Sequence, residues 1–328
     1  MSPNTSSTQN HPNRLWYDHP ARYWTEALPL GNGRLGAMVF GGIAAEHIQF
    51  NEESLWSGYP YDHANPSALA WLPKVRQAVF SGDYEAADQL VKHMQGPFTQ
   101  SYLPFGDVYL EFEAAGDPQT YTHSLDLNTA IDVTEYQLAE ASFRRECFIS
   151  APANVLVMLL SSTQAGGLTF RVRMDSLLKH QVQAQGDQLL LTGKAPQQDD
   201  PNYLHTENPI VYGEEGMTFA ARLGVQIQRG EIKIDGNTLV IHSADAARLT
   251  LSAATSFNGH HHSPAFAGKD PLSITAQTLA AAQSRSVQDL LQEHLAEYQP
   301  FFRKVELEIG GGAAADMPTD RRIASFKT

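Results

Sequence analysis

The chain has a single cysteine, Cys147, among its 328 residues. One thiol cannot close an intramolecular disulfide, and it cannot supply the cysteine set of a zinc or iron–sulfur site. No uninterrupted run of about 18 apolar residues is present, which excludes a transmembrane helix. Basic residues are also scarce: 23 Lys and Arg against 36 Asp and Glu give a net charge of −13. This acidic balance argues against nucleic acid and anionic membrane surfaces as partners.

The composition supplies enough apolar material for a large core. Hydrophobic residues make up 42% of the chain and charged residues 18%, values that exclude wholesale disorder. The length corresponds to two domains if each has roughly 150 residues. The 24 glycines and 18 prolines indicate strands and turns more than helices.

The amino-terminal residues are polar and lack the apolar block of a secretory signal. We therefore interpret residues 1–14 as a disordered tail. The sequence leaves the compartment unknown: it is cytoplasmic as it stands, and periplasmic or secreted if a signal has been removed.

About a dozen segments have the alternation or the short apolar run of a β-strand. Residues 155–160 are apolar on both faces, as expected for a strand between two layers. Asp235, Gly236 and Asn237 predict a tight hairpin between two of the segments. So many short strands with turns between them favour a mainly β sandwich over a doubly wound sheet. The predicted strands are 36–40, 46–50, 107–113, 131–138, 143–149, 155–160, 168–174, 189–192, 217–227, 231–234, 239–242 and 248–254.

Apolar residues recur at helical spacing in two other parts of the chain, 69–94 and 274–298. We place a β domain at residues 15–268 and a helical linker from residue 269 to residue 328. A last strand-like segment, 304–309, leads into glycines 310–312, which predict a flexible stretch. The linker helices are expected to bury Leu279, Leu290, Leu291, Leu295 and Tyr298.

The usual signatures of catalysis are missing: there is no Gly-x-Ser-x-Gly, His-Glu-x-x-His or Gly-Lys-Ser/Thr pattern. The glycine-rich run 31–36 precedes a strand instead of a helix, so it predicts a tight turn and not a nucleotide loop. Three adjacent histidines, 260–262, would alternate in direction on an extended chain, which favours an exposed loop over a metal site. Cys147 is expected to be a small buried hydrophobe. No metal or cofactor is predicted.

The run Asn51-Glu52-Glu53-Ser54-Leu55-Trp56-Ser57-Gly58 carries the strongest hint of a binding site. Sugars stack their apolar faces on aromatic rings, and acids accept hydrogen bonds from their hydroxyl groups. A strand end with a buried tryptophan and solvated acids explains the same residues without any ligand. Asn51, Glu52 and Trp56 are the candidates for substrate binding or for an interface.

Several blocks of the chain together resemble the amino-terminal domain of glycoside hydrolase family 95 α-L-fucosidases. They occur in the family's order from Leu15 to Arg322. The blocks are 15–17, Trp24-Thr25-Glu26-Ala27-Leu28-Pro29-Leu30-Gly31-Asn32-Gly33-Arg34-Leu35-Gly36, 37–42, 51–58, 105–110, 145–148, 253–257, 291–302 and 318–322.

The resemblance implies a galactose-mutarotase-like β super-sandwich followed by a short helical linker. In that family both lead into an (α/α) barrel, where a glutamic acid acts as general acid and asparagines, helped by an aspartate, activate water for inversion. No position of this chain matches those catalytic residues. The expectation is thus a non-catalytic domain plus linker and the start of a missing barrel. Its partners would be that barrel and, through the whole enzyme, fucosylated oligosaccharides.

Two alternatives remain open at the level of sequence. The chain could be a carbohydrate-binding or assembly module without hydrolysis of its own. The parent enzyme could also be an α-L-galactosidase, because L-fucose is 6-deoxy-L-galactose and the residues that distinguish the two sugars are not in this chain.

Overall fold

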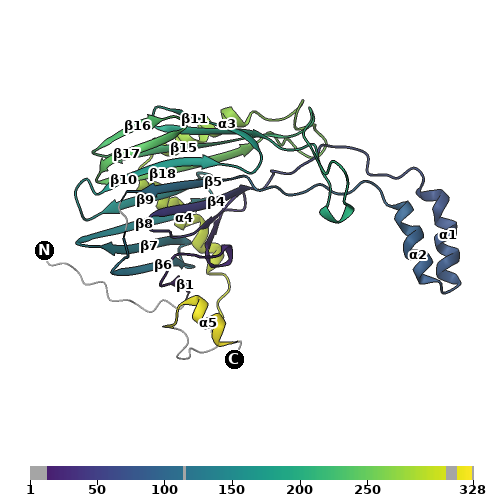
Figure 1. The fold of residues 1–328 in the computed structure, drawn as a ribbon, viewed down its shortest axis with the longest axis horizontal. Coiled ribbons are helices and arrows are strands. Elements are labelled where there is room, and N and C mark those ends of the chain that lie inside the picture. Colours follow the sequence, from purple (N-terminus) through teal and green to yellow (C-terminus); the bar gives the residue numbers. More distant parts are fainter. Residues whose placement is uncertain (1–12, 114–115, 308–315, 327–328) are drawn as a thin grey trace.

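Two antiparallel sheets dominate the computed structural model (Figure 1), which describes residues 13–113, 116–307 and 316–326. The larger sheet has nine strands among the described residues. In spatial order they are β1 (Arg14–Tyr17), β6 (Thr120–Asp126), β7 (Ile131–Leu138), β8 (Ala141–Ser150), β9 (Val155–Ser162), β18 (Ala246–Thr255), β15 (Thr218–Gln228), β12 (Gln188–Lys194) and β11 (Lys179–Gln185).

The second sheet has seven strands in the same described ranges. They are β16 (Glu231–Asp235), β17 (Thr238–Ala244), β10 (Leu168–Asp175), β5 (Gly106–Phe112), β4 (Ala45–Glu52), β3 (Leu35–Val39) and β2 (Leu28–Gly31). A short separate pair joins β13 (Gln198–Asp199) to β14 (Ile210–Val211). The predicted mainly β sandwich is confirmed, as is the hairpin at 235–238, where Asp235 pairs with Thr238.

The main core fills the space between the two sheets. Inward-facing residues of β4 and β5 meet those of β8, β15 and β18 in one continuous hydrophobic cluster. Phe105 joins the layers, because its ring centroid lies 5.2 Å from that of Phe50 and 4.9 Å from that of Phe219. The alternation of apolar residues in the sequence, with a period of two, corresponds to this inner face.

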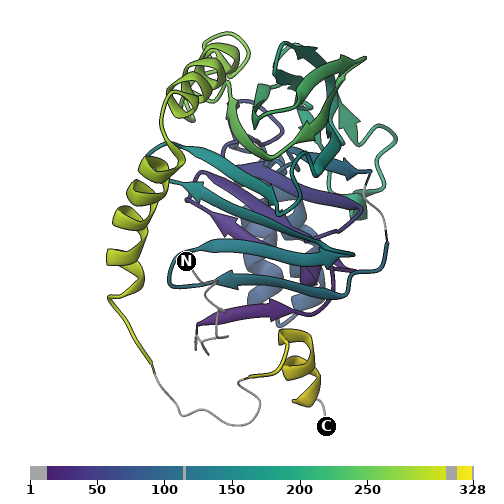
Figure 2. The same ribbon diagram turned by 90° about the vertical axis from the view of Figure 1, so that its left-hand side faces the viewer.

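Two consecutive helices, α3 (Pro271–Gln283) and α4 (Val287–Phe302), cover the outer face of the larger sheet (Figure 2). Ala282 and Leu290 pack there with Val155, Val157 and Phe148 in a second hydrophobic cluster. This packing explains why the segment 155–160 is apolar on both sides, as the sequence predicted.

The predicted burial of the linker helices is confirmed for Leu279 and Leu290. Leu291, Leu295 and Tyr298 are half-buried. His294, which the sequence did not single out, is buried instead, and its Nε2 lies 2.7 Å from the carbonyl oxygen of Thr129. The proposed division between residues 268 and 269 stays a prediction.

The remaining helices lie away from the main core. They are α1 (Ala68–Phe80), α2 (Tyr84–Val91) and α5 (Thr319–Ser325), with single 3₁₀ turns η1 (Trp24–Glu26), η2 (Lys92–Met94) and η3 (Asn202–Leu204). α5 lies beside β1, where the backbone N–H of Trp16 donates to Thr319 Oγ1 at 3.0 Å. None of the helices in the described ranges is long and apolar enough to cross a membrane.

Two sequence expectations need correction. Residues 305–307 form no strand, so the strand predicted over 304–309 is wrong in its described part, and 308–312 lie outside the described residues. The predicted tail also lies largely outside them, but Arg14 begins β1 and pairs with Asp126. The predicted mobility of 1–12 and of the glycines at 310–312 stays a prediction.

Candidate functional site

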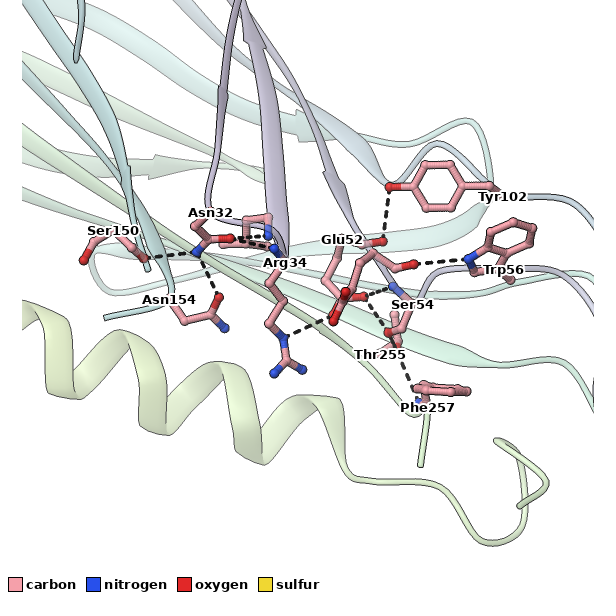
Figure 3. Close-up of polar contacts among 12 residues, drawn as sticks. Asn32, Arg34, Glu52, Ser54, Trp56, Tyr102, Ser150, Asn154, Thr255 and Phe257 are labelled. Carbon is pink, nitrogen blue, oxygen red and sulfur yellow. Dashed lines mark hydrogen bonds and ion pairs between the residues drawn. The ribbon is translucent and has the colours of Figure 1, made fainter. Parts of the chain in front are cut away.

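The three candidate residues lie at and just beyond the end of β4, and their exposure differs. The Glu52 side chain is fully buried. Its Oε2 accepts hydrogen bonds from Ser54 N at 2.9 Å and from Ser54 Oγ at 2.6 Å. Its Oε1 lies 3.5 Å from Arg34 Nε. Glu52 therefore cannot receive a sugar hydroxyl directly, and it organises the chain around it (Figure 3).

A chain of hydroxyl contacts links this loop to the last strand of the larger sheet. Ser54 Oγ gives its proton to Glu52, so the Thr255 hydroxyl donates to Ser54 Oγ across 2.5 Å. Thr255 Oγ1 in turn accepts from the backbone N–H of Phe257 at 3.2 Å. Glu52 thus fixes the end of β4 to the end of β18.

The glycine-rich run 31–36 forms the tight turn that the sequence predicted, between β2 and β3. Gly33 occupies the left-handed region with φ of +85°, which favours glycine. Asn32 Oδ1 accepts from the backbone N–H groups of Arg34 at 2.9 Å and Leu35 at 2.7 Å. The Asn32 amide also donates to Ser150 O at 3.1 Å, which ties the turn to the larger sheet.

Asn51 has a structural role at the same end of the sandwich. Its Oδ1 accepts a hydrogen bond of 2.8 Å from the backbone N–H of Phe105. This contact joins β4 to the segment that enters β5. Asn51 and Glu52 are both committed to neighbouring protein groups.

Trp56 is the candidate that remains available to a ligand, with 45% of its surface exposed. It forms an isolated antiparallel bridge with Tyr102, and the two ring centroids are 5.5 Å apart. Its indole N–H donates to Glu53 O at 3.1 Å. The indole is therefore held by its neighbours while much of its surface stays exposed.

A cavity of about 520 Å³ lies beside this tryptophan. Trp56, Tyr59, Tyr61 and Phe257 supply aromatic surface, and the other lining residues are mostly small or polar. Volume and lining are those of a site for a sugar-sized ligand. The lining residues are Glu53, Ser54, Trp56, Ser57, Gly58, Tyr59, Pro60, Tyr61, His63, Thr99, Gln100, Met217, Phe257, Gly259, His260, His262 and Pro264.

Of the described residues that line the cavity, Glu53 alone carries a carboxylate. Inverting glycosidases need two carboxyl groups about 6.5–9.5 Å apart, and this lining supplies one. His260 and His262 border the cavity, but the described residues hold no group of three or more His, Cys, Asp or Glu that could bind a metal. The cavity has the size for a sugar or a protein side chain, and its described lining contains one carboxylate.

A second group of titratable residues lies buried between the sheets and was missed by the sequence analysis. Arg145 Nη1 lies 3.2 Å from Glu46 Oε2, and His123 Nε2 lies 2.7 Å from Asp132 Oδ2. Burial raises the pKa of Glu46, and the positive charge of Arg145 opposes that shift. The alternation of β4 contained the signal, since Glu46 has the inward parity of Ile48 and Phe50.

Cys147 lies fully buried near this group, as predicted. Burial raises the pKa of its thiol well above the ordinary value, and the nearby carboxylates of Asp132 and Glu46 raise it further. A thiol in this environment is a poor nucleophile.

Comparison with known proteins decides the family. Residues 15–260 match the family model described as "Glycosyl hydrolase family 65, N-terminal domain". The chain belongs to this family. Its curated relatives carry fucosidase names, which agree with the resemblance to family 95 α-L-fucosidases found in the sequence.

The chain is 33% identical to "Alpha-L-fucosidase 2" of Arabidopsis thaliana, with 97% of the chain and 40% of that relative covered. It is 28% identical to "Probable alpha-fucosidase A" of Aspergillus niger, and the match covers 95% of this chain and 40% of that relative. The chain thus spans about 40% of the length of these curated relatives.

A solved structure titled "Putative kojibiose phosphorylase from human microbiome" has the same fold. The two structures superimpose with a TM-score of 0.52 at 10% sequence identity, and the superposition covers 97% of this chain and 41% of the other. At this identity the likeness concerns the fold alone, and it confirms the predicted sandwich architecture.

Proposed function

We propose that this chain is the non-catalytic N-terminal β domain and linker of an inverting α-L-fucosidase. The observation that carries the proposal is the coverage of its relatives: proteins named as fucosidases match nearly the whole chain over 40% of their own length. The cavity beside Trp56 has one carboxylate in its described lining, which is consistent with catalytic groups that lie in another part of the enzyme. In this proposal the barrel of the same polypeptide hydrolyses terminal α-L-fucosyl linkages.

The roles that we propose for the candidate residues follow from their exposure. Trp56 and the cavity beside it form part of the rim of the substrate site or contact the barrel. Asn51 and Glu52 are positioning residues, because both side chains bind neighbouring backbone or hydroxyl groups. Arg34 is half-exposed and pairs with the buried carboxylate of Glu52, so we assign it a positioning role as well.

An assay on an aryl α-L-fucoside tests the proposal. The 328-residue chain is expected to give no turnover above the uncatalysed rate, and the longer enzyme is expected to release the aryl group with inversion at the anomeric carbon. The matched aryl α-L-galactoside distinguishes the two sugar specificities. Turnover by the 328-residue chain would contradict a non-catalytic domain, and an inactive longer protein would contradict the fucosidase assignment.

The exposed ring of Trp56 gives a second prediction. In the longer enzyme, Trp56→Ala is expected to raise KM about tenfold, which corresponds to about 1.4 kcal/mol of lost aromatic contact, with kcat changed less than about threefold. Trp56→Phe should keep most of the affinity. Trp24→Ala is the matched control, because Trp24 is also exposed and bonds Gln49 away from the cavity. Equal effects of Trp56→Ala and Trp24→Ala on KM would exclude a role at the rim.

A carbohydrate-binding module is the second candidate, and the aromatic lining of the cavity favours it. Calorimetric titration of the 328-residue chain with fucosylated oligosaccharide separates the two functions. Binding that Trp56→Ala abolishes would support the module, because the rim of a shared site binds weakly without its other half.

A further inference from the structure

The helices α1 and α2 form an antiparallel hairpin that projects away from the sandwich (Figure 1). Two extended segments, 53–67 and 95–105, carry it. Within the described residues its substantial packing is between α1, α2 and η2, not against either sheet. The hairpin is thus a separate element at the tip of two arms.

This hairpin has almost no interior of its own. Ala78 on α1 and Ala87 on α2 are its buried residues. Large apolar side chains are instead exposed: Leu69 by 76%, Phe80 by 86% and Tyr84 by 70%. Helices of 13 and 8 residues are marginal in water without tertiary packing. A stable hairpin therefore needs a surface to pack against.

The exposed apolar residues follow helical spacing and form a stripe on each helix. On α1, Leu69, Pro73 and Phe80 lie on one face at helical spacing, with the charged Arg76 between them. On α2, Tyr84 and Val91 lie on one face, with the charged Asp88 between them. An apolar stripe of this spacing is the surface by which a helix docks into a hydrophobic groove.

The two arms connect the hairpin to the cavity. The bridge between Trp56 and Tyr102 closes their base. Farther out, the Tyr61 hydroxyl donates to Phe98 O at 2.6 Å, and the Asn65 amide donates to His93 O at 2.9 Å. The same arms line the cavity, so one partner surface can meet both the cavity and the hairpin.

We propose that the α1–α2 hairpin docks on an α-helical catalytic domain supplied by the rest of the same polypeptide. This inference rests on the proposed function, under which the chain is one part of a longer glycosidase. The chain covers 40% of the length of the Arabidopsis thaliana relative. The remaining part of that relative, about 60% (100% minus 40%), is long enough to form such a domain. The stripes of α1 and α2 clamp the side of that domain while the cavity faces its substrate end.

Hydrogen exchange measured by mass spectrometry tests the docking. Amides of residues 68–91 are expected to exchange quickly in the 328-residue chain and about 100-fold more slowly in the longer enzyme, because docking removes local opening. The double variant Leu69→Ser, Phe80→Ser should abolish that protection in the longer enzyme. Leu177→Ser is the matched control, since Leu177 is 82% exposed on the sandwich.

The hairpin lies outside both hydrophobic clusters, so the double variant should leave the thermal midpoint of the 328-residue chain within about 2 °C of the unmodified chain. Equal, fast exchange of 68–91 in both lengths would overturn the proposal. Protection that appears in the 328-residue chain together with a dimer mass in light scattering would also overturn it, because the occupant is then a second copy. Fucoside turnover is measured on the same samples, so an inactive longer protein with a protected hairpin refutes the proposed function and leaves the docking intact.

Discussion

Replacing Arg145 with methionine is expected to lower the free energy of unfolding by about 3–5 kcal/mol at pH 8, the usual cost of leaving a buried charge without its partner. Arg145 is almost fully buried, and its Nη1 lies 3.2 Å from Glu46 Oε2. Its Nη2 donates to the carbonyl oxygen of Gly42. Methionine keeps much of the side-chain volume, so the loss reports the charge and its hydrogen bonds more than a cavity.

The loss should depend on pH with a definite sign. Burial already raises the pKa of Glu46, with Arg145 and His123 opposing the shift and Asp132 adding to it. Without Arg145 the pKa rises further, and the folded variant keeps a proton that the unfolded chain releases. Its free energy of unfolding therefore falls as pH rises above the ordinary glutamate pKa, by at most about 1.4 kcal/mol per pH unit. Urea unfolding at pH 5 and pH 8 should show a smaller deficit at pH 5.

Two variants control this experiment. Glu46→Gln, Arg145→Met removes both charges and should recover most of the loss at pH 8. Arg144→Met removes the neighbouring arginine, which is half-buried and pairs with Glu135 and Glu146 at the surface, and should cost about 1 kcal/mol or less. A deficit in Arg145→Met that is the same at both pH values would show that Glu46 remains ionised without its partner.

The sandwich could be predicted from the sequence because each predicted strand buries either one face, which gives an alternating pattern, or both faces, which gives a continuous apolar run. The alternation in 131–138 coincides with β7, and the doubly apolar run 155–160 lies between the inter-sheet core and α3–α4. The sequence did not predict β6 and β11, because Thr120–Asp126 and Lys179–Gln185 contain few apolar residues. β11 lies at the edge of the larger sheet, and only Val182 and Ala184 on its inner face pack against the core.

The location of the candidate site could be predicted from the sequence, but the role of each of its residues could not. The run 51–58 does border the cavity, but sequence adjacency cannot show that Glu52 turns inward while Trp56 stays exposed. Glu52 is the last residue of β4 and shares the inward parity of Phe50, whereas Trp56 lies beyond the strand. The partner of Ser54, Thr255, is 201 residues away, a contact that only the fold reveals.

The attachment of α3 and α4 to the sandwich depends on one further buried cation, Arg248 on β18. Its Nη2 donates to Ala282 O at 2.7 Å and its Nη1 to Arg285 O at 2.8 Å, at the carboxyl end of α3. Its Nε donates to Thr250 Oγ1 at 3.2 Å. The Ala282 carbonyl also accepts from the backbone N–H of Arg285 at 3.2 Å, and a cation at this end favours the helix dipole. Arg248 thus joins the sheet to the junction of the two helices.

Arg248→Met is therefore expected to lower the free energy of unfolding by about 2–3 kcal/mol, since hydrogen bonds to a charged group contribute about 1.5–3 kcal/mol. Amides of 271–302 should also exchange faster than those of β9 and β18, because the helices lose their polar anchor before the inter-sheet core opens. Arg229→Met is the matched control: Arg229 is exposed and pairs with Asp245 at 3.2 Å, and its loss should cost about 1 kcal/mol or less. If Arg248→Met costs no more than Arg229→Met, the apolar contacts of Ala282 and Leu290 hold the linker helices by themselves.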